Sequence, residues 1–137
     1  MEKVKPYTSY YPKDTNAESK ERKHIILLDG TWNDETGQGA DNLVTNIVQM
    51  SRVFKNDESK QIVRYHRGVG NDNDNNSIKS KWKGATGKAI AAIIEKAYAR
   101  FVQDWQKGDR IYIFGFSRGA AAARILASKI ANEGIPK

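Results

Sequence analysis

The stretch IYIFGFSRGAAAAR at residues 111–124 joins an apolar run to a Gly-x-Ser-x-Gly sequence and a run of small residues. The apolar run predicts a buried strand, and the alanine-rich segment after it predicts a helix. A serine at such a junction lies in a turn so tight that its neighbours need minimal side chains, here Gly115 and Gly119. The hydroxyl of Ser117 is then held above the carboxyl edge of the sheet, near the positive end of the next helix. This pattern favours a hydrolase nucleophile in its elbow, and a sharp turn without chemistry is the alternative.

The rest of the chain repeats the order strand, helix, strand, helix, strand, helix. Short apolar runs that end in glycine or precede it predict strands at residues 25–30, 61–70 and 111–116. Apolar residues at helical spacing predict the helices between and after them, with Asn42 capping the first, Gly108 following the second and Gly134 ending the third. This alternation predicts an α/β fold, a parallel sheet with helices on both faces.

The length of 137 residues with 39% apolar residues is enough for one domain with a single core. Residues 1–23 are polar and show no period, so we expect a flexible N-terminal arm before a domain at residues 24–137. No apolar run approaches the roughly 20 residues of a membrane span, and the start lacks the apolar core of a signal peptide. We therefore expect a cytoplasmic product whose export, if any, uses a signal-peptide-independent secretion system.

The charge balance favours anionic partners. The chain has 23 Lys and Arg against 16 Asp and Glu, a formal net charge of +7, which favours phospholipid headgroups or nucleic acid over acidic proteins. Four lysines around Trp82 could contact a lipid surface or nucleic acid, but scattered surface lysines explain them better: Lys79, Lys81, Lys83 and Lys88. An anionic membrane surface is thus a possible partner, and nucleic acid is not favoured.

Metal and cofactor motifs are weak in this sequence. The chain has no cysteine and two histidines, too few for a histidine-rich metal site. The alternating Asp72, Asp74 and Asn76 lack the glycine and glutamate that a calcium loop needs further on. The glycine motifs at residues 68–73 and 84–88 match neither a dinucleotide fingerprint nor a P-loop. We therefore predict no metal site and no cofactor.

A serine nucleophile also needs donors for the negative oxygen of its tetrahedral intermediate. One donor is expected to be the backbone N–H of Arg118, and a second should come from the loop after another strand. That loop is Asp29-Gly30-Thr31-Trp32, so we predict an oxyanion hole made of Arg118, Gly30 and Thr31. Asp29 follows an apolar strand, as does the nucleophile of haloacid dehalogenase phosphatases, but those enzymes have the motif Asp-x-Asp and this chain has Thr31 at the second position. We therefore reject that match and favour hydrogen bonding within the loop as the role of Asp29.

Four motifs in this order resemble a family of uncharacterised α/β-hydrolase domains whose known members include phospholipase effectors of bacterial type VI secretion systems: LLDGTWN (27–33), NIVQM (46–50), YHRGVG (65–70) and GFSRGAAAAR (115–124). The resemblance covers residues 24 to about 135. It implies a partial α/β-hydrolase fold, Ser117 as the nucleophile, the Gly30 loop beside it, and lipid esters, phospholipids above all, as substrates.

The chain departs from the family in its triad. In α/β-hydrolases an acid and then a histidine follow the serine along the chain, but here no histidine follows His66, and Glu133 at the far end of the last helix is the only acid after Ser117. His66 is expected two strand spacings, roughly 9 to 10 Å, from the nucleophile strand, whereas a hydrogen bond needs about 3 Å. His24 is expected at the opposite edge of the sheet. The triad acid and base are therefore missing from this sequence.

Two interpretations remain of a chain that has the nucleophile and the oxyanion loop but lacks the triad acid and base. In the first, the chain is the N-terminal half of a hydrolase, active only with a C-terminal half that pairs with the open sheet edge, or through self-association at that edge. In the second, the chain is a non-catalytic binding or regulatory module that keeps the elbow as a structural turn. The coding sequence past residue 137, searched for strands followed by Asp and His, would discriminate between them.

Overall fold

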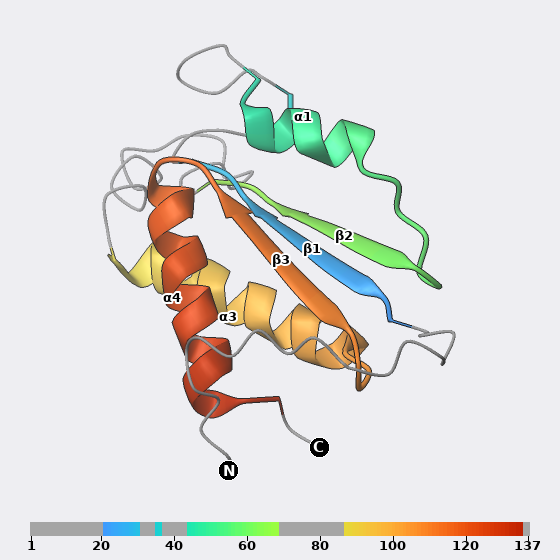
Figure 1. The fold of residues 1–137 in the computed structure, drawn as a ribbon. Coiled ribbons are helices and arrows are strands. Elements are labelled where there is room, and N and C mark those ends of the chain that lie inside the picture. The colour runs from blue at the N-terminus through green and yellow to red at the C-terminus, as the bar shows by residue number, and fades with distance from the viewer. Residues whose placement is uncertain (1–20, 31–34, 37–43, 69–86, 136–137) are drawn as a thin grey trace.

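The computed structural model describes residues 21–30, 35–36, 44–68 and 87–135 (Figure 1). Strands and helices alternate along this part of the chain, which confirms the predicted α/β fold. The elements are β1 (Lys23–Leu28), α1 (Asn46–Val53), β2 (Gln61–His66), α3 (Gly87–Asp104), β3 (Arg110–Gly115) and α4 (Arg118–Glu133).

The strands form a parallel sheet, as predicted, in the order β2-β1-β3, so β1 lies in the middle and two strand spacings separate β2 from β3, as expected for His66. Its residues Ile25–Leu28 are at most 5% exposed because both faces and both edges of β1 are covered. Leu28, the last residue of β1, pairs with His66 on one side and with Gly115 on the other. The carboxyl ends of all strands therefore meet at one edge, where a site on an α/β sheet is expected.

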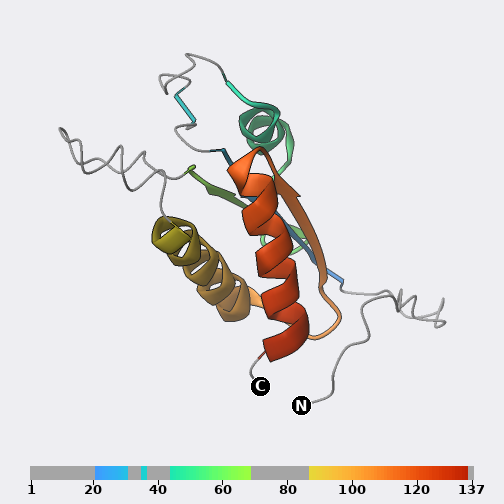
Figure 2. The same cartoon turned by 90° about the vertical axis from the view of Figure 1, so that its left-hand side faces the viewer.

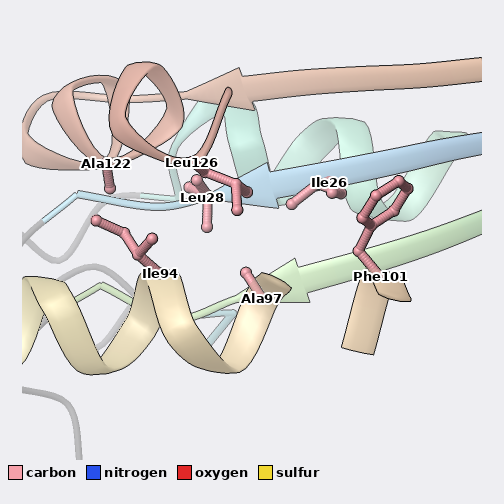
Figure 3. Packing of buried hydrophobic residues seen from close by; sticks show 7 residues of the cluster. All are labelled: Ile26, Leu28, Ile94, Ala97, Phe101, Ala122 and Leu126. Atoms are coloured by element: carbon pink, nitrogen blue, oxygen red, sulfur yellow. The ribbon is translucent and has the colours of Figure 1, made fainter. Parts of the chain in front are cut away.

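Side chains alternate between the two faces of β1, and each face has its own helices. Ile26 and Leu28 pack against α3 and α4 (Figure 3), whereas Ile25 and Leu27 pack against Ile47 of α1. Figure 2 shows α1 on one side of the sheet and α3 and α4 on the other. The α3 and α4 residues of the larger cluster are Ile94, Ala97, Phe101, Ala122 and Leu126.

The prediction that Asn42 caps the first helix is wrong. The helix begins at Asn46, and the cap is Thr45, whose Oγ1 accepts a hydrogen bond from the backbone N–H of Val48 at 3.3 Å. Asn42 itself lies outside the described residues. The apolar spacing at Leu43 extended the predicted helix too far upstream, because periodicity alone does not show which polar residue turns the backbone out of the helix.

The second predicted helix, α3, also ends earlier than the position of Gly108 predicted. It stops at Asp104, and Gly108 lies in a turn closed by a hydrogen bond from Asp109 N to the carbonyl of Gln106 at 3.0 Å, with φ of 95°. Trp105 packs against the core although it lies beyond the end of the helix. Its apolar side chain continues the helical spacing of the sequence, so the predicted helix was too long. Gly134 is confirmed as the C-cap of α4, with φ of 70° and its N–H bonded to Ile130 O at 2.9 Å.

A buried ion cluster joins the amino ends of the strands. The Asp109 carboxylate, just before β3, accepts bonds from Arg22 Nη2 at 2.9 Å and the Gln106 backbone N–H at 3.0 Å, and lies 2.7 Å from His24 Nε2 of β1. The Arg22 guanidinium also donates to the carbonyls of Asp104 and Glu58. Burial disfavours the ionised Asp109, but the hydrogen bonds from Arg22 and His24 outweigh it and lower the pKa of the carboxyl.

We expect Asp109→Asn to destabilise the fold by about 3 kcal/mol, because it leaves the partly buried Arg22 and the buried His24 without the carboxylate that both contact. Urea unfolding at pH 7 measures this, and Glu133→Gln, which removes an exposed partner of Lys129, should leave the urea midpoint unchanged. Equal midpoints for the two variants would contradict the assigned role of the cluster. The lowered pKa means that this stabilisation is present above about pH 3.8 and is lost as the pH falls further.

Candidate functional site

The turn between β3 and α4 carries the Gly-x-Ser-x-Gly sequence at the carboxyl edge of the sheet. β3 ends at Gly115 and α4 begins at Arg118, so two residues reverse the chain direction. Ser117 has φ of 55° and ψ of −123°, and it is the only described residue other than glycine with positive φ. Such a conformation costs a residue with a side chain about 1–3 kcal/mol and is typical of functional turns.

Both glycines of the turn lie where no side chain fits. A Cβ at Gly115 would meet Gly119 O at 2.3 Å, and a Cβ at Gly119 would meet Leu28 O at 2.3 Å and Asp29 O at 2.5 Å. Backbone hydrogen bonds hold this close packing, from Phe116 N to Leu28 O at 3.1 Å and from Gly119 N to Phe116 O at 2.8 Å. The start of α4 is therefore pressed against the end of β1.

The side chain of Ser117 is exposed and makes no hydrogen bond to cap α4. Arg118, the first residue of α4, is also exposed. Backbone N–H groups in the first turn of a helix have no acceptor within the helix. The backbone N–H of Arg118 thus lies at the first position of α4, directly after Ser117, where the sequence predicted a donor of the oxyanion hole.

The loop after β1 is anchored by a buried aspartate. Asp29 Oδ1 accepts bonds from the Gly30 N–H at 2.9 Å and Thr45 Oγ1 at 2.8 Å, and Oδ2 accepts one from the Tyr65 hydroxyl at 2.6 Å. The expectation that Asp29 holds its own loop is thus confirmed at Gly30. Gly30 is buried at the same edge as Ser117, and the predicted partner Thr31 lies outside the described residues.

Sequence reasoning missed the partners of Asp29. Thr45 both donates to Asp29 and caps α1, and Tyr65 reaches Asp29 from β2. Together they tie the candidate oxyanion loop to two other elements. A polar residue before a helix is a signal for a cap, but nothing in the sequence pairs that residue with an aspartate 16 positions earlier.

His66 is not brought to Ser117. It ends β2, so β1 separates it from β3, and it lines a small pocket on the α3 side of the sheet with Ala97, Phe101 and Asp104. Burial, and then the positive charges of Arg100, Lys96 and Arg64, lower the pKa of His66 from 6.5 to about 4. The imidazole is therefore a neutral, buried group of the core at pH 7.

The lowered pKa of His66 predicts that the fold loses stability in mild acid. Between pH 6.5 and about 4 the unfolded chain binds a proton that the folded chain does not, so stability falls as the pH decreases through this window. The full loss is about 3 kcal/mol from this shift. Urea unfolding at pH 7, 5.5 and 4 should show a shallower decline for His66→Phe, and equal declines would contradict the prediction.

The other predicted groups lie apart from this turn or outside the described residues. His24 is the second residue of β1, at the amino edge, and Glu133 lies at the far end of α4 beside Lys129. The loop with Asp72, Asp74 and Asn76 and the lysine cluster around Trp82 lie outside the described residues, apart from Lys88 in α3. Within the described residues, no three acidic or histidine side chains are grouped to hold a metal, and no helix has the length and hydropathy to cross a membrane.

Comparisons with known proteins add a family and one distant relative. The sequence model of a family described as T6SS, phospholipase effector Tle1-like, catalytic domain, matches residues 22–137. The uncharacterised protein YEL023C of Saccharomyces cerevisiae is 32% identical over 133 residues, a match that covers 88% of this chain and 19% of the yeast protein. The chain thus spans about a fifth of the length of that curated relative. No solved structure matches the chain significantly.

Proposed function

Because the chain belongs to the family of Tle1-like catalytic domains of type VI secretion phospholipase effectors, we propose that it is the part of a serine ester hydrolase that holds the nucleophile and the oxyanion hole. The observation that carries this proposal is the strained, exposed Ser117 between two glycines that tolerate no side chain. A turn kept only for its shape would favour glycine at a position with positive φ, whereas this turn keeps a serine there with an exposed hydroxyl.

In this mechanism Ser117 Oγ attacks the acyl carbon of an ester, and a base takes its proton. The negative carbonyl oxygen accepts hydrogen bonds from the Arg118 N–H and from the Gly30–Thr31 loop, which Asp29 holds in place. The alcohol leaves with the proton from the base, and water then releases the acid from the acyl-enzyme. Lipid esters, phospholipids in particular, are the proposed substrates, in keeping with the family and with the net charge of +7.

The base and acid of the triad must come from outside this sequence, since its two histidines, His24 and His66, lie elsewhere in the fold. The β3 side of the sheet is the proposed place for the missing elements. Among the described residues β3 pairs with β1 alone, and Tyr112 and Phe116 beside this edge are 38% and 46% exposed. Further strands would cover these rings, complete the domain that begins near residue 24, and bring the acid and histidine to Ser117.

Self-association through the same edge is the competing explanation, and a concentration-independent monomer mass in light scattering counts against it. Delivery through the type VI system, and contact with an anionic membrane surface, follow for this chain only if the hydrolase proposal holds. The second candidate function, a non-catalytic binding module, is favoured by one observation, the lack of any histidine after His66.

The test is intact-mass spectrometry after incubation with a fluorophosphonate. The chain is treated alone and together with the polypeptide encoded downstream of it, and Ser117→Ala is treated in parallel. We expect a single adduct that the substitution abolishes and that forms faster when the downstream polypeptide is present. If neither sample gains an adduct, the non-catalytic module is the better account.

A further inference from the structure

A small pocket opens next to Ser117 on the α3 side of the carboxyl edge. Its lining comes from the first turns of α3 and α4 and from the end of β1. Two arginines and two isoleucines from three different segments line it: Arg67, which follows β2, Ile90 and Ile93 of α3, and Arg118 of α4. Two positive charges beside an apolar wall form an amphipathic surface one residue away from the candidate nucleophile.

We propose that the two exposed guanidinium groups at the mouth of this pocket, Arg67 and Arg118, bind the phosphate group of a glycerophospholipid whose ester lies at Ser117. The pocket itself has a volume of about 10 Å³, room for about one water molecule, so the phosphate lies at its mouth. The inference rests on the proposed hydrolase function and adds to it the place of the headgroup. Guanidinium groups match phosphate oxygens in geometry and charge. The start of α4 adds the positive end of a helix dipole to the same spot.

The ion pair that Arg67 makes does not prevent such binding. Arg67 Nε donates to the two carboxylate oxygens of Glu35 at 2.9 and 2.8 Å, and both side chains of this pair are about 40% exposed. Arg118 also interacts with other groups of the chain. Exposed ion pairs contribute little net energy, so a phosphate can take the place of a carboxylate at a small cost.

The apolar wall suits the rest of such a ligand. Ile90 and Ile93 are partly buried against the α3–α4 core and also line the pocket. The glycerol carbons of a phospholipid, between the phosphate and the ester, can pack on them. Asp29 lines the pocket too, but its carboxylate already accepts from Gly30, Thr45 and Tyr65. These three hydrogen bonds partly compensate the negative charge of Asp29, which reduces its repulsion of a phosphate.

Isothermal titration calorimetry of the purified chain tests the pocket with four probes. These are dihexanoylphosphatidylglycerol below its micelle concentration, glycerol 3-phosphate, inorganic phosphate and uncharged dihexanoylglycerol. We expect the phospholipid to bind at least tenfold more tightly than dihexanoylglycerol and more tightly than either free phosphate compound. The double variant Arg67→Gln/Arg118→Gln should lose at least tenfold in affinity for the phospholipid, as expected when hydrogen bonds to a charged group are removed.

The control variant Arg100→Gln/Arg124→Gln removes the same number of charges from exposed positions on α3 and α4, and it should bind the phospholipid as the unsubstituted chain does. Circular dichroism of both variants shows that they fold. Equal losses of phospholipid affinity in the two double variants, or no loss in Arg67→Gln/Arg118→Gln, would overturn the proposal that these arginines bind phosphate. Inorganic phosphate binding as tightly as the phospholipid would overturn the lipid headgroup as its source.

Fluorophosphonate labelling of Ser117 in the unsubstituted chain separates this inference from the hydrolase proposal. If Ser117 is labelled but phospholipid binding does not depend on the two arginines, the hydrolase proposal stands and the phosphate-binding proposal is wrong. Arginine-dependent binding without labelling, even in the presence of the downstream polypeptide, keeps phosphate recognition and overturns its link to ester cleavage at Ser117.

Discussion

Gly119→Ala should lower the melting temperature of the chain by about 10 °C or prevent folding altogether. The new Cβ would lie 2.3 Å from Leu28 O and 2.5 Å from Asp29 O, distances that only a backbone shift can relieve. Moving α4 away from β1 would open the packing of Ala122 and Leu126 on Ile26 and Leu28 (Figure 3). We expect a cost of at least about 3 kcal/mol, the upper end for overpacking a well-filled site.

The matched control is Gly87→Ala, at the start of α3, where an added Cβ meets no heavy atom within 4 Å. The same substitution there should leave the stability unchanged or raise it by about 0.4–1 kcal/mol, because alanine restricts the unfolded chain more than glycine does. Thermal unfolding followed by circular dichroism measures both variants. A Gly119→Ala protein as stable as Gly87→Ala would show that the close contact between α4 and β1 does not exist in solution.

Ser117→Ala should reduce ester hydrolysis by at least about a thousandfold in the longest polypeptide that contains the missing acid and histidine. The hydroxyl is the atom that forms the acyl-enzyme, and the described residues of the turn offer no second nucleophile in its place. Hydrolysis of a short-chain phospholipid, followed by release of fatty acid, measures the loss. The binding of the uncleaved lipid should change far less than the rate, because alanine removes one exposed atom.

Ser117→Gly distinguishes a catalytic serine from a structural one. Glycine adopts φ of 55° without strain, so this variant should also be inactive yet more stable than the unsubstituted chain by about 1 kcal/mol. Greater stability with no activity means that the serine is kept at this strained position for its chemistry. Retained hydrolysis in either variant would exclude Ser117 as the nucleophile.

Much of the fold could be predicted because local geometry determines it. The uninterrupted apolar run of β1 indicates a strand buried on both faces, and the spacing of Ile94, Ala97 and Phe101 indicates one face of a helix. The alternation of such segments leaves few topologies, and the parallel order with β1 in the middle is among them. The turn at Ser117 was also predictable, since its glycines are close neighbours along the chain.

The ends of the helices were predicted less well, because they depend on tertiary contacts and not only on the periodicity of apolar residues. Thr45 instead of Asn42 begins α1, and Thr45 is also the residue that bonds to Asp29 at the end of β1. Trp105 continues the apolar pattern of α3 but lies beyond its last residue, packed against the ring of Phe101. A side chain can reach the core from a turn as well as from a helix, so the apolar pattern runs past the backbone structure.

Strand, helix and turn identities thus follow from the chain alone, because spacing along the backbone determines which side chains share a face or meet within a turn. The contacts that shape the site do not. Gly119 presses against Leu28, and Arg22 pairs with Asp109 across 87 positions, only because the register of β1 with its neighbours brings those residues together. Nothing in local sequence encodes such a pairing, since its energy arises only once the sheet and its helices are packed.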